Sequence, residues 1–309
     1  ANTSEKARAK VLACARELGV MEGMAAGRLL LNSLVVFAPQ RAFDERSDIF
    51  YYRVIQSVSK GLASHDVRLR YCALEENDSD AQLFLARMNE ADTQAAILLG
   101  IDDQHIHDLA VDVGKPCMLI NCRDRHMRLP AVAPDHRAIG ERAAEYLFEM
   151  GHREVMNVLC LRRYTMELRL SGIRDAWQSH NLTFNDKRDL LVVPSFSAKE
   201  TEQLVSEWLN QQKGKDLPTA FLVGGDFMAA GTISALQNHG LRVPQDVSVM
   251  SIDGFNLAAI QDVPLTAVHV PRDELGTEAV HMLQQRLMRL DAPVGTLLLN
   301  GTLAVRESV

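Results

Sequence analysis

The sequence predicts an α/β fold in which two doubly wound parallel sheets follow one another along the chain. Short apolar runs rich in β-branched residues alternate with longer amphipathic segments over residues 33–150. The same alternation starts again after Gly151. Strands that are apolar throughout need cover on both faces, and right-handed crossovers supply that cover as helices. Such sheets bind ligands at the carboxyl ends of their strands, so we expect a ligand cleft between the two units.

The first unit is predicted to contain four strands and two helices. The strands lie at residues 34–39, 67–74, 95–101 and 116–122, and the helices at residues 50–66 and 81–92. Runs such as LVVFAP and AAILLGI are short, apolar and bounded by turn residues, which favours buried strands. His105 and His107 fall in a polar stretch, where we interpret them as solvated loop residues rather than metal ligands.

The second unit repeats the pattern with four strands and three helices. The strands lie at residues 155–161, 189–195, 219–225 and 247–253, and the helices at about 167–180, 198–212 and 226–239. Asp226 is expected to cap the third helix, and Gly240 to end it in a left-handed conformation. The last strand then carries Asp253 to its carboxyl end, on the side of the cleft.

The segment before the first strand differs from both units. Residues 4–19 are predicted to form an amphipathic helix that Ser4 caps and Gly19 ends. Residues 21–32 are short and apolar, contain two glycines, and are interpreted as a linker.

Composition limits the classes of protein that fit. The chain has 309 residues and is 47% hydrophobic, so it can bury two cores. Its net charge of −7 argues against a surface dominated by phosphate contacts, but it says little about DNA binding if the DNA-reading part is small or partly missing. Its five cysteines include no CxxC pair and are interpreted as reduced, buried thiols of a cytoplasmic protein. No apolar run approaches the roughly 18 residues that cross a bilayer, so no membrane partner is expected.

Enzymatic motifs are missing from the sequence. No glycine-rich phosphate loop follows the first strand, and neither GxSxG nor HExxH occurs. The ten histidines are scattered and form no metal-ligand spacing. We therefore expect a protein that is not an enzyme and that needs no cofactor and no metal.

Five segments together resemble one protein family. They are SEKARAKVLACARELGV (4–20), VAPDHRAIGERAAEYLFEMGHREV (132–155), LRLSGIRDAW (168–177), GLRVPQDVSVMSIDGFNLAAIQDVPLTAV (240–268) and GTLAVRESV (301–309). In this order they resemble the third headpiece helix and the effector-binding core of LacI/GalR bacterial transcriptional regulators. The resemblance implies a core like the type I periplasmic binding proteins, preceded by a remnant of a helix-turn-helix headpiece.

The resemblance also implies a division of the chain into three parts. The headpiece remnant and hinge segment occupy residues 1–32. The N-terminal effector-binding subdomain comprises residues 33–150 and about 270–296, and the C-terminal one comprises residues 151–269 and about 297–309.

Two residues of the second unit are the first candidates for effector binding. Asp253 is placed to accept hydrogen bonds from ligand hydroxyls, with a turn-capping role as the alternative. Arg169 occupies the position of the family's Arg-Leu-x-Gly arginine, and its five donors suit a sugar oxygen, a carboxylate or a phosphate. A surface salt bridge of Arg169 with Glu167 or Asp175 is the alternative.

Six further residues complete the expected effector site, each with a structural alternative. Asp135 should cap the helix that begins near His136 or contact the ligand. Gly225 and Asp226 stand where the family usually has Asn-Asp, so a hydrogen bond of that Asn is missing or made elsewhere. Phe50 and Tyr51 take the place of an aromatic pair that stacks on the sugar face, or pack in the core. Arg272 lies where family members place a ligand contact.

The arginines suggest a hypothesis about the effector. If Arg169 and Arg272, with Arg162 or Arg163, converge on one cleft, the effector is acidic or phosphorylated. A neutral sugar or nucleoside is the alternative that the family favours.

The resemblance further implies that the chain is a regulator, in particular a repressor, that binds operator DNA as a homodimer. Effector binding would close the two subdomains and change operator affinity. Hinge residues Ala26, Arg28 and Leu29 would contact DNA, with Leu29 as the minor-groove wedge. The recognition helix is absent from this sequence, so operator binding needs the full-length headpiece. A periplasmic-type sugar-binding protein without a DNA function is the rival interpretation.

Overall fold

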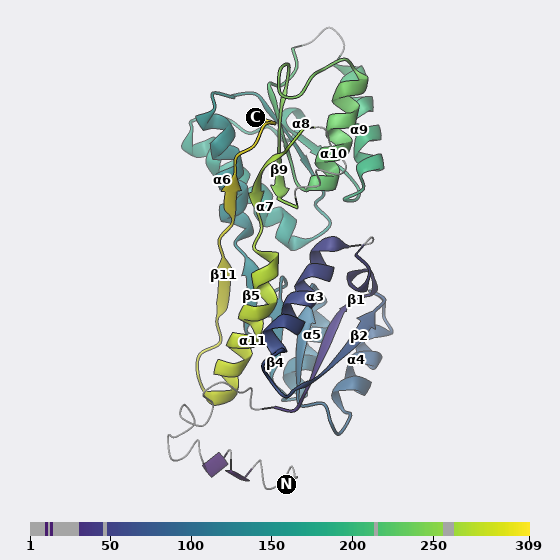
Figure 1. The fold of residues 1–309 in the computed structure, drawn as a ribbon, viewed down its shortest axis with the longest axis vertical. Coiled ribbons are helices and arrows are strands. Elements are labelled where there is room, and N and C mark those ends of the chain that lie inside the picture. The colour runs from purple at the N-terminus through teal and green to yellow at the C-terminus, as the bar shows by residue number, and fades with distance from the viewer. Residues whose placement is uncertain (1–9, 12, 15–30, 46–47, 213–215, 256–262) are drawn as a thin grey trace. The chain divides into compact units, whose positions relative to one another are not determined.

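The computed structural model describes residues 31–45, 48–212, 216–255 and 263–309, together with residues 10, 11, 13 and 14 (Figure 1). The chain divides into two compact units, one of residues 1–133 and 272–297 and the other of residues 134–271 and 298–309. Each unit holds an α/β sheet, as the sequence predicted. No helix in the described part of the chain is long and apolar enough to cross a membrane.

The first sheet has six strands in the order β11-β5-β4-β3-β1-β2. The strands are β1 (Ser33–Pro39), β2 (Arg68–Leu74), β3 (Ala95–Leu99), β4 (Cys117–Ile120), β5 (Ala131–Pro134) and β11 (Thr296–Leu299). The helices are α3 (Ile49–Leu62), α4 (Asp80–Met88), α5 (Gln104–Asp112) and α11 (Arg272–Met288), with a short 3-10 helix at Gln40–Phe43. All residues of β1 and β3 are buried, which explains why their sequences are apolar without alternation.

Alternate residues of these strands face opposite helix pairs. Val35 and Phe37 of β1 pack in a cluster with Phe84 and Met88 of α4 and Ile106 of α5. The other helix pair is formed by α3 and α11, which pack against each other. The sheet is therefore covered on both faces, as a doubly wound sheet requires.

The second sheet also has six strands, in the order β12-β10-β9-β8-β6-β7. The strands are β6 (Val155–Leu159), β7 (Leu190–Val192), β8 (Ala220–Val223), β9 (Ser248–Asp253), β10 (Thr266–His269) and β12 (Thr302–Ala304). The helices are α6 (His136–Glu149), α7 (Tyr164–Ser179), α8 (Asp186–Asp189), α9 (Ala198–Gln211) and α10 (Asp226–Asn238). The ladders of β6 to β10 are parallel, and only the β10–β12 ladder in this sheet is antiparallel.

Two helix pairs flank the second sheet, α6 with α7 and α9 with α10 (Figure 1). Residues of β6, β8 and β9 form one apolar cluster with Val205 and Leu209 of α9 and Met228 and Ile233 of α10. The helix α10 ends before Gly240, which has a φ of 78°, as the sequence predicted for this glycine. The strand β9 carries Asp253 to its carboxyl end.

The boundary between the units differs from the expected one at residue 150. The helix α6 belongs to the second unit because it packs directly on α7. A Cβ at Gly172 of α7 would lie 1.8 Å from the carbonyl oxygen of Arg137, so the two helix backbones touch. The sequence showed a helix here but not which sheet it would cover.

The predicted N-terminal helix is described at four residues only. Lys10, Val11, Ala13 and Cys14 are helical and exposed, within the predicted helix of residues 4–19. The hinge residues Ala26, Arg28 and Leu29 lie outside the described residues. Of the cysteines, four are buried, whereas Cys14 is exposed and departs from the prediction of buried thiols.

Candidate ligand site

A buried ion pair lies at the carboxyl edge of the second sheet. The Nη2 atom of Arg169 in α7 donates to Oδ1 of Asp253, the last residue of β9, over 3.1 Å. The two side chains are 3% and 15% exposed. The predicted alternative for Arg169, a surface pair with Glu167 or Asp175, is wrong, because Asp175 accepts instead from Arg137 at 2.5 and 2.9 Å.

The guanidinium of Arg169 has two further partners. Its Nη1 donates to the carbonyl oxygen of Gly224 over 2.9 Å, and its Nε donates to Nδ1 of His136 over 3.2 Å. Each of the three guanidinium nitrogens thus has an acceptor on a different part of the second unit. Sequence analysis did not select His136, although it directly follows Asp135, which was selected.

His136 accepts from Arg169 as a neutral imidazole. The side chain is 2% exposed. Burial and the adjacent positive charge of Arg169 hold the pKa of His136 well below its ordinary value of 6.5. Its Nδ1 lone pair is therefore available at neutral pH. A neutral imidazole thus lies beside the Arg169–Asp253 ion pair.

Asp253 has a backbone conformation that is rare for a residue with a side chain. Its φ is 134°. The buried carboxylate of Asp226 accepts from the Ser251 hydroxyl and from the backbone amides of Gly254 and Phe255, and so holds the turn in which Asp253 lies. The prediction that Asp226 caps α10 is wrong: Gly225 is the N-cap, and the Asp226 side chain points to the β9 turn instead.

Gly225 lies between the Asp253 carboxylate and the ring of Phe196. A Cβ at Gly225 would lie 3.2 Å from Oδ2 of Asp253 and 3.6 Å from the ring of Phe196. Phe196 is 39% exposed, in the connection from β7 to α9. An aromatic ring therefore lies close to the ion pair, at a position that sequence analysis missed. The available signal was a phenylalanine in an otherwise polar stretch, PSFSAKE.

Asp135 caps α6, the role that the sequence predicted as one of two. Its side chain accepts from the amide of Ala138 over 3.0 Å, and its own amide donates to the carbonyl oxygen of Leu299 over 2.8 Å. These contacts fix the start of the helix on which His136 is the first residue. Asp135 therefore supports the site through His136.

The candidate effector-binding residues of the first unit are Phe50, Tyr51 and Arg272, and Tyr51 packs within the core of that unit. Tyr51 is 4% exposed, and its hydroxyl accepts from Nδ2 of Asn121 over 3.0 Å, so it is a core residue with a polar partner. Phe50 meets Tyr51 edge to face with ring centroids 5.2 Å apart. Arg272 is the first residue of α11 and is buried. Because Arg169 and Arg272 belong to different units, their convergence stays a prediction.

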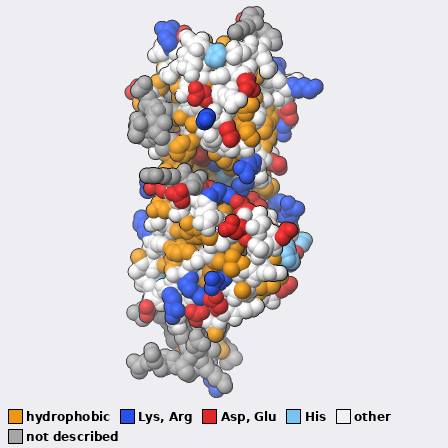
Figure 2. Space-filling view, turned by 90° about the vertical axis from the view of Figure 1, so that its right-hand side faces the viewer, with side chains coloured by type: hydrophobic (Ala, Val, Ile, Leu, Met, Phe, Trp, Pro, Cys, Tyr) orange, Lys and Arg blue, Asp and Glu red, His pale blue; other side chains and the backbone are white. Residues whose placement is uncertain are grey.

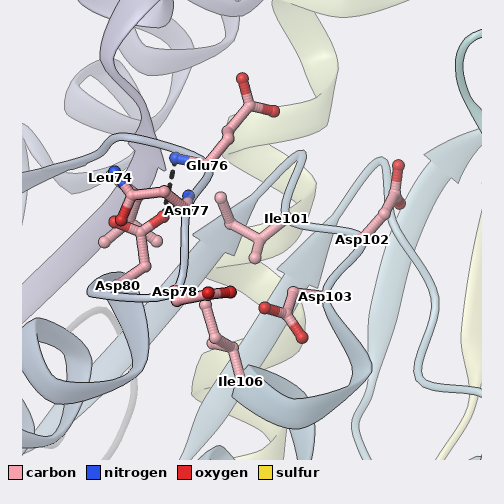
Figure 3. Close-up of a pocket in the computed structure, with 9 residues that line it drawn as sticks. All are labelled: Leu74, Glu76, Asn77, Asp78, Asp80, Ile101, Asp102, Asp103 and Ile106. Carbon is pink, nitrogen blue, oxygen red and sulfur yellow. Dashed lines mark hydrogen bonds between the residues drawn. The ribbon is translucent and has the colours of Figure 1, made fainter.

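A cavity of about 300 Å³ lies at the carboxyl ends of β2 and β3 in the first unit (Figure 3). Its residues are Leu74, Glu76, Asn77, Asp78, Asp80, Ile101, Asp102, Asp103 and Ile106. The carboxylate of Asp80 is used within the fold, because it accepts from the amides of Glu75, Glu76 and Asn77. The rim is acidic, and it therefore disfavours anionic ligands at this edge of the first sheet.

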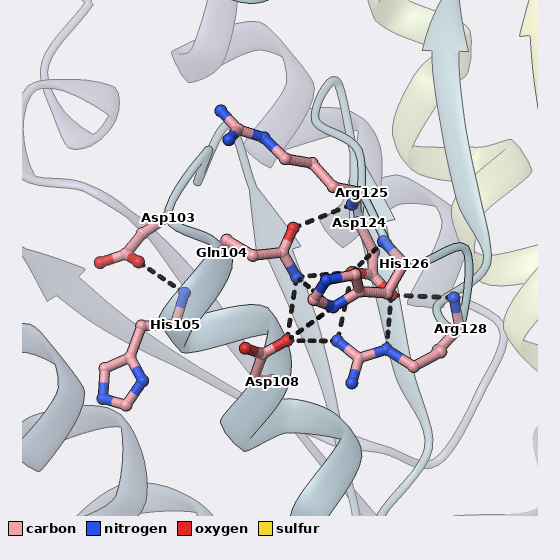
Figure 4. A network of polar contacts seen from close by, with 8 residues as sticks. All are labelled: Asp103, Gln104, His105, Asp108, Asp124, Arg125, His126 and Arg128. Atoms are coloured by element: carbon pink, nitrogen blue, oxygen red, sulfur yellow. Dashed lines mark hydrogen bonds and ion pairs between the residues drawn. The ribbon is translucent and has the colours of Figure 1, made fainter.

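The two histidines expected in a polar loop, His105 and His107, lie on the helix α5 instead, and Figure 4 shows His105 there. His107 is fully buried, and its Nε2 donates to the carbonyl oxygen of Ile101 over 2.7 Å. The sequence of α5 is polar because it carries Gln104 and Asp108, which bind Asp124 and Arg128 of the loop after β4. The prediction of solvated loop histidines is thus wrong for His107.

That loop is held by a network around Asp124 and Arg128 (Figure 4). Arg128 pairs with both Asp108 and Asp124. Burial opposes ionisation of Asp124, but the hydrogen bonds from Arg128 and Gln104 outweigh it and hold the pKa of Asp124 below its ordinary range. Ligand atoms of Asp108, Asp124 and His126 lie within 4.8 Å of one another, yet Arg128 already supplies the positive charge that a metal ion would bring.

The face of the molecule shown in Figure 2 carries no large patch of basic side chains. Acidic and basic side chains are interspersed there. Several pair locally, as Arg174 does with Asp186 and Arg142 does with Glu149.

The chain is similar to a known protein domain and to known transcriptional repressors. A family model described as "Periplasmic binding protein-like domain" matches residues 144–309, more than half of the chain. The HTH-type transcriptional repressor PurR of Proteus mirabilis is 28% identical over 99% of this chain and 89% of that protein. The relatives are transcriptional regulators and not enzymes.

Solved structures share the fold. The transcriptional regulator CelR in complex with cellobiose superposes with a TM-score of 0.76 at 19% identity, over 100% of this chain and 92% of that chain. A LacI family regulator from Enterococcus faecium with bound ribose gives a TM-score of 0.73 at 18% identity, over 90% of this chain and 98% of that chain.

Proposed function

The chain belongs to the LacI/GalR family as a ligand-binding transcriptional regulator, and we propose that its second unit binds hydroxyl groups of a neutral effector through Asp253 and Arg169. The observation that carries this proposal is the buried pair of these residues, in which the two charges compensate. A neutral effector does not disturb that balance, whereas an anionic one would compete with Asp253 for Arg169.

The chemistry of the exposed atoms supports a sugar or a nucleoside. A carboxylate has about four acceptor positions, so Asp253 can accept from ligand hydroxyls while it also accepts from Arg169. The ring of Phe196 offers an apolar face close to Asp253, as sugar rings and bases require. Two solved regulators of similar fold are described with the neutral sugars cellobiose and ribose.

The regulatory part of the proposal follows from the family. We expect repression of transcription in the cytoplasm, by a homodimer that binds operator DNA through a complete headpiece. The hinge residues Ala26, Arg28 and Leu29 would take part in that contact. Effector binding would change operator affinity through a coupling free energy of about 1–3 kcal/mol.

A thermal-shift panel tests the effector class. Wild-type protein is melted with D-ribose, cellobiose and adenosine, and in parallel with D-galacturonate and ribose 5-phosphate. A ligand at about 100 times its dissociation constant stabilises by about 2.7 kcal/mol, which raises the melting temperature by roughly 5–10 °C for a unit of this size. Stabilisation by neutral compounds supports the proposal. Stabilisation by the acidic compounds alone would restore the hypothesis of an acidic or phosphorylated effector.

A further inference from the structure

We propose that His136 is a positioning residue for the ligand site, which fixes the plane of the Arg169 guanidinium through a hydrogen bond to its neutral imidazole. The inference deepens the proposed function and rests on it for its consequence in effector binding. The hydrogen bond itself can be tested without any effector.

Each guanidinium nitrogen of Arg169 donates one hydrogen bond to a different acceptor. Nη1 and Nη2 are directed to Gly224 and Asp253, and Nε is directed to His136. Nε is the guanidinium nitrogen bonded to the aliphatic part of the side chain. Its hydrogen bond to His136 therefore determines how the guanidinium plane is rotated about that part of the side chain. Three of the five N–H groups are used on acceptors of the described chain. The other two, one on each terminal nitrogen, can then meet effector oxygens in a fixed orientation.

Local structure brings His136 to this position. The carboxylate of Asp135 caps α6, so His136 begins the helix at a fixed place. A Cβ at Gly140 would lie only 2.2 Å from the carbonyl oxygen of Arg169, which shows that α6 and α7 are in backbone contact beside the pair. Without this close approach the imidazole would not reach Nε of Arg169.

The hydrogen bond requires one tautomer of His136. Nδ1 accepts, so it carries no proton, and the ring proton is on Nε2. An apolar side chain of similar size could fill the same space but would leave the Nε–H of Arg169 without this acceptor. Asparagine can place its Oδ1 where Nδ1 now lies. The two substitutions therefore separate the hydrogen bond from simple packing.

The experiment is nitrogen-15 NMR of the full chain, with Arg169 assigned by its loss in Arg169→Lys. Wild-type protein is expected to show an unprotonated Nδ1 at His136, a coupling across the Nε–H···Nδ1 hydrogen bond, and slow exchange of the Arg169 Nε–H with water. His136→Leu should speed that exchange by about tenfold or more, as loss of a hydrogen bond to a charged group implies. His136→Asn should restore slow exchange, and His105→Ala, at an exposed histidine of the first unit, should change nothing.

Two results would overturn the inference. One is a proton on Nδ1 of wild-type His136, a measurement that does not depend on any variant folding. The other is unchanged exchange of the Arg169 Nε–H in folded His136→Leu. Titration with D-ribose, cellobiose and adenosine adds the functional consequence, a roughly tenfold loss of affinity in His136→Leu that His136→Asn recovers. If none of the three binds wild-type protein, the proposed function fails while the NMR result still decides the role of His136.

Discussion

Asp253 and Arg169 each hold a charge that is largely removed from water. A buried charge is tolerated when it is paired and hydrogen-bonded, and it is costly when its partner is removed. Arg169 is 3% exposed, so the loss of Asp253 would leave a guanidinium with only neutral acceptors, Gly224 and His136. The intact pair therefore adds little net free energy to folding, whereas the loss of either partner is strongly destabilising.

Asp253→Ala is expected to lower the free energy of unfolding of the second unit by about 3 kcal/mol. The double variant Arg169→Met/Asp253→Ala should be less destabilised, because it removes both charges. Urea denaturation measures both values. Asp186→Asn, at an exposed ion pair with Arg174, serves as the control and should change little. Arg169→Met alone completes the cycle, and if its effect and that of Asp253→Ala simply add in the double variant, the residues are not coupled.

His107 makes stability depend on pH. Burial lowers the pKa of His107 below 6.5, although its bond to Ile101 opposes the shift. The unfolded chain therefore binds a proton at a higher pH than the folded chain does. Stability from this residue is complete above pH 6.5 and falls as the pH drops from there towards the folded pKa. His136, whose pKa is lowered in the same direction, adds to this loss.

Urea midpoints at pH 7.5 and pH 5.5 check this dependence. Wild-type protein should be less stable at the lower pH. His107→Leu should be less stable than wild type at pH 7.5, because the carbonyl of Ile101 loses its donor, and should show a smaller change between the two pH values. An unchanged pH dependence in His107→Leu would mean that His107 does not carry the effect.

At the scale of elements, the helix pair α6 and α7 positions the site. Gly172 and Gly140 allow the two helix backbones to touch, which places His136 and Arg169 side by side. We expect Gly172→Ala to force the helices apart and cost about 1–3 kcal/mol or more, since a Cβ would lie 1.8 Å from the Arg137 carbonyl oxygen. Thermal unfolding measures the loss.

Gly295→Ala is the matched control for that substitution. No atom lies within 4 Å of a Cβ at Gly295. The control should therefore unfold like wild type. Equal melting temperatures for Gly172→Ala and wild type would contradict the close packing of α6 on α7.

Sequence patterns predicted strands better than polar helices. The runs at β1, β3, β8 and β9 are apolar and short, and their strands were predicted within a few residues. The helix α5 was missed because its exposed face binds a neighbouring loop through polar side chains, which weakens the apolar periodicity. Asp226 was misassigned because an Asp before a helix is typically a cap, whereas here the carboxylate holds the β9 turn.

Local sequence patterns also identified single residues of the candidate site but not the contacts between them. Asp253 and Arg169 could be selected from their family positions, and Asp253 from the end of its strand. Their mutual pairing could not, because 84 residues separate them and the pair forms only when the fold brings the Arg169 side chain to the end of β9. His136 and Phe196 reach the site through helix packing and a loop, for which the sequence offers no periodic signal.

At the scale of the whole molecule, both tryptophans report on the same unit. Trp177 is buried in α7, and Trp208 packs against the core of the second unit in α9. These two residues account for all tryptophan in the chain. Tryptophan fluorescence therefore follows unfolding of the unit that contains Asp253, whereas circular dichroism follows the helices of both units.

The most direct test of a neutral effector at Asp253 is fluorescence-monitored thermal unfolding of wild type and Asp253→Asn with D-ribose, cellobiose, adenosine, D-galacturonate and ribose 5-phosphate. A neutral compound is expected to raise the wild-type transition by roughly 5–10 °C at about 100 times its dissociation constant, and Asp253→Asn is expected to lose most of this rise. Stabilisation by the acidic compounds alone, or an equal rise in Asp253→Asn, would contradict binding of a neutral effector at Asp253.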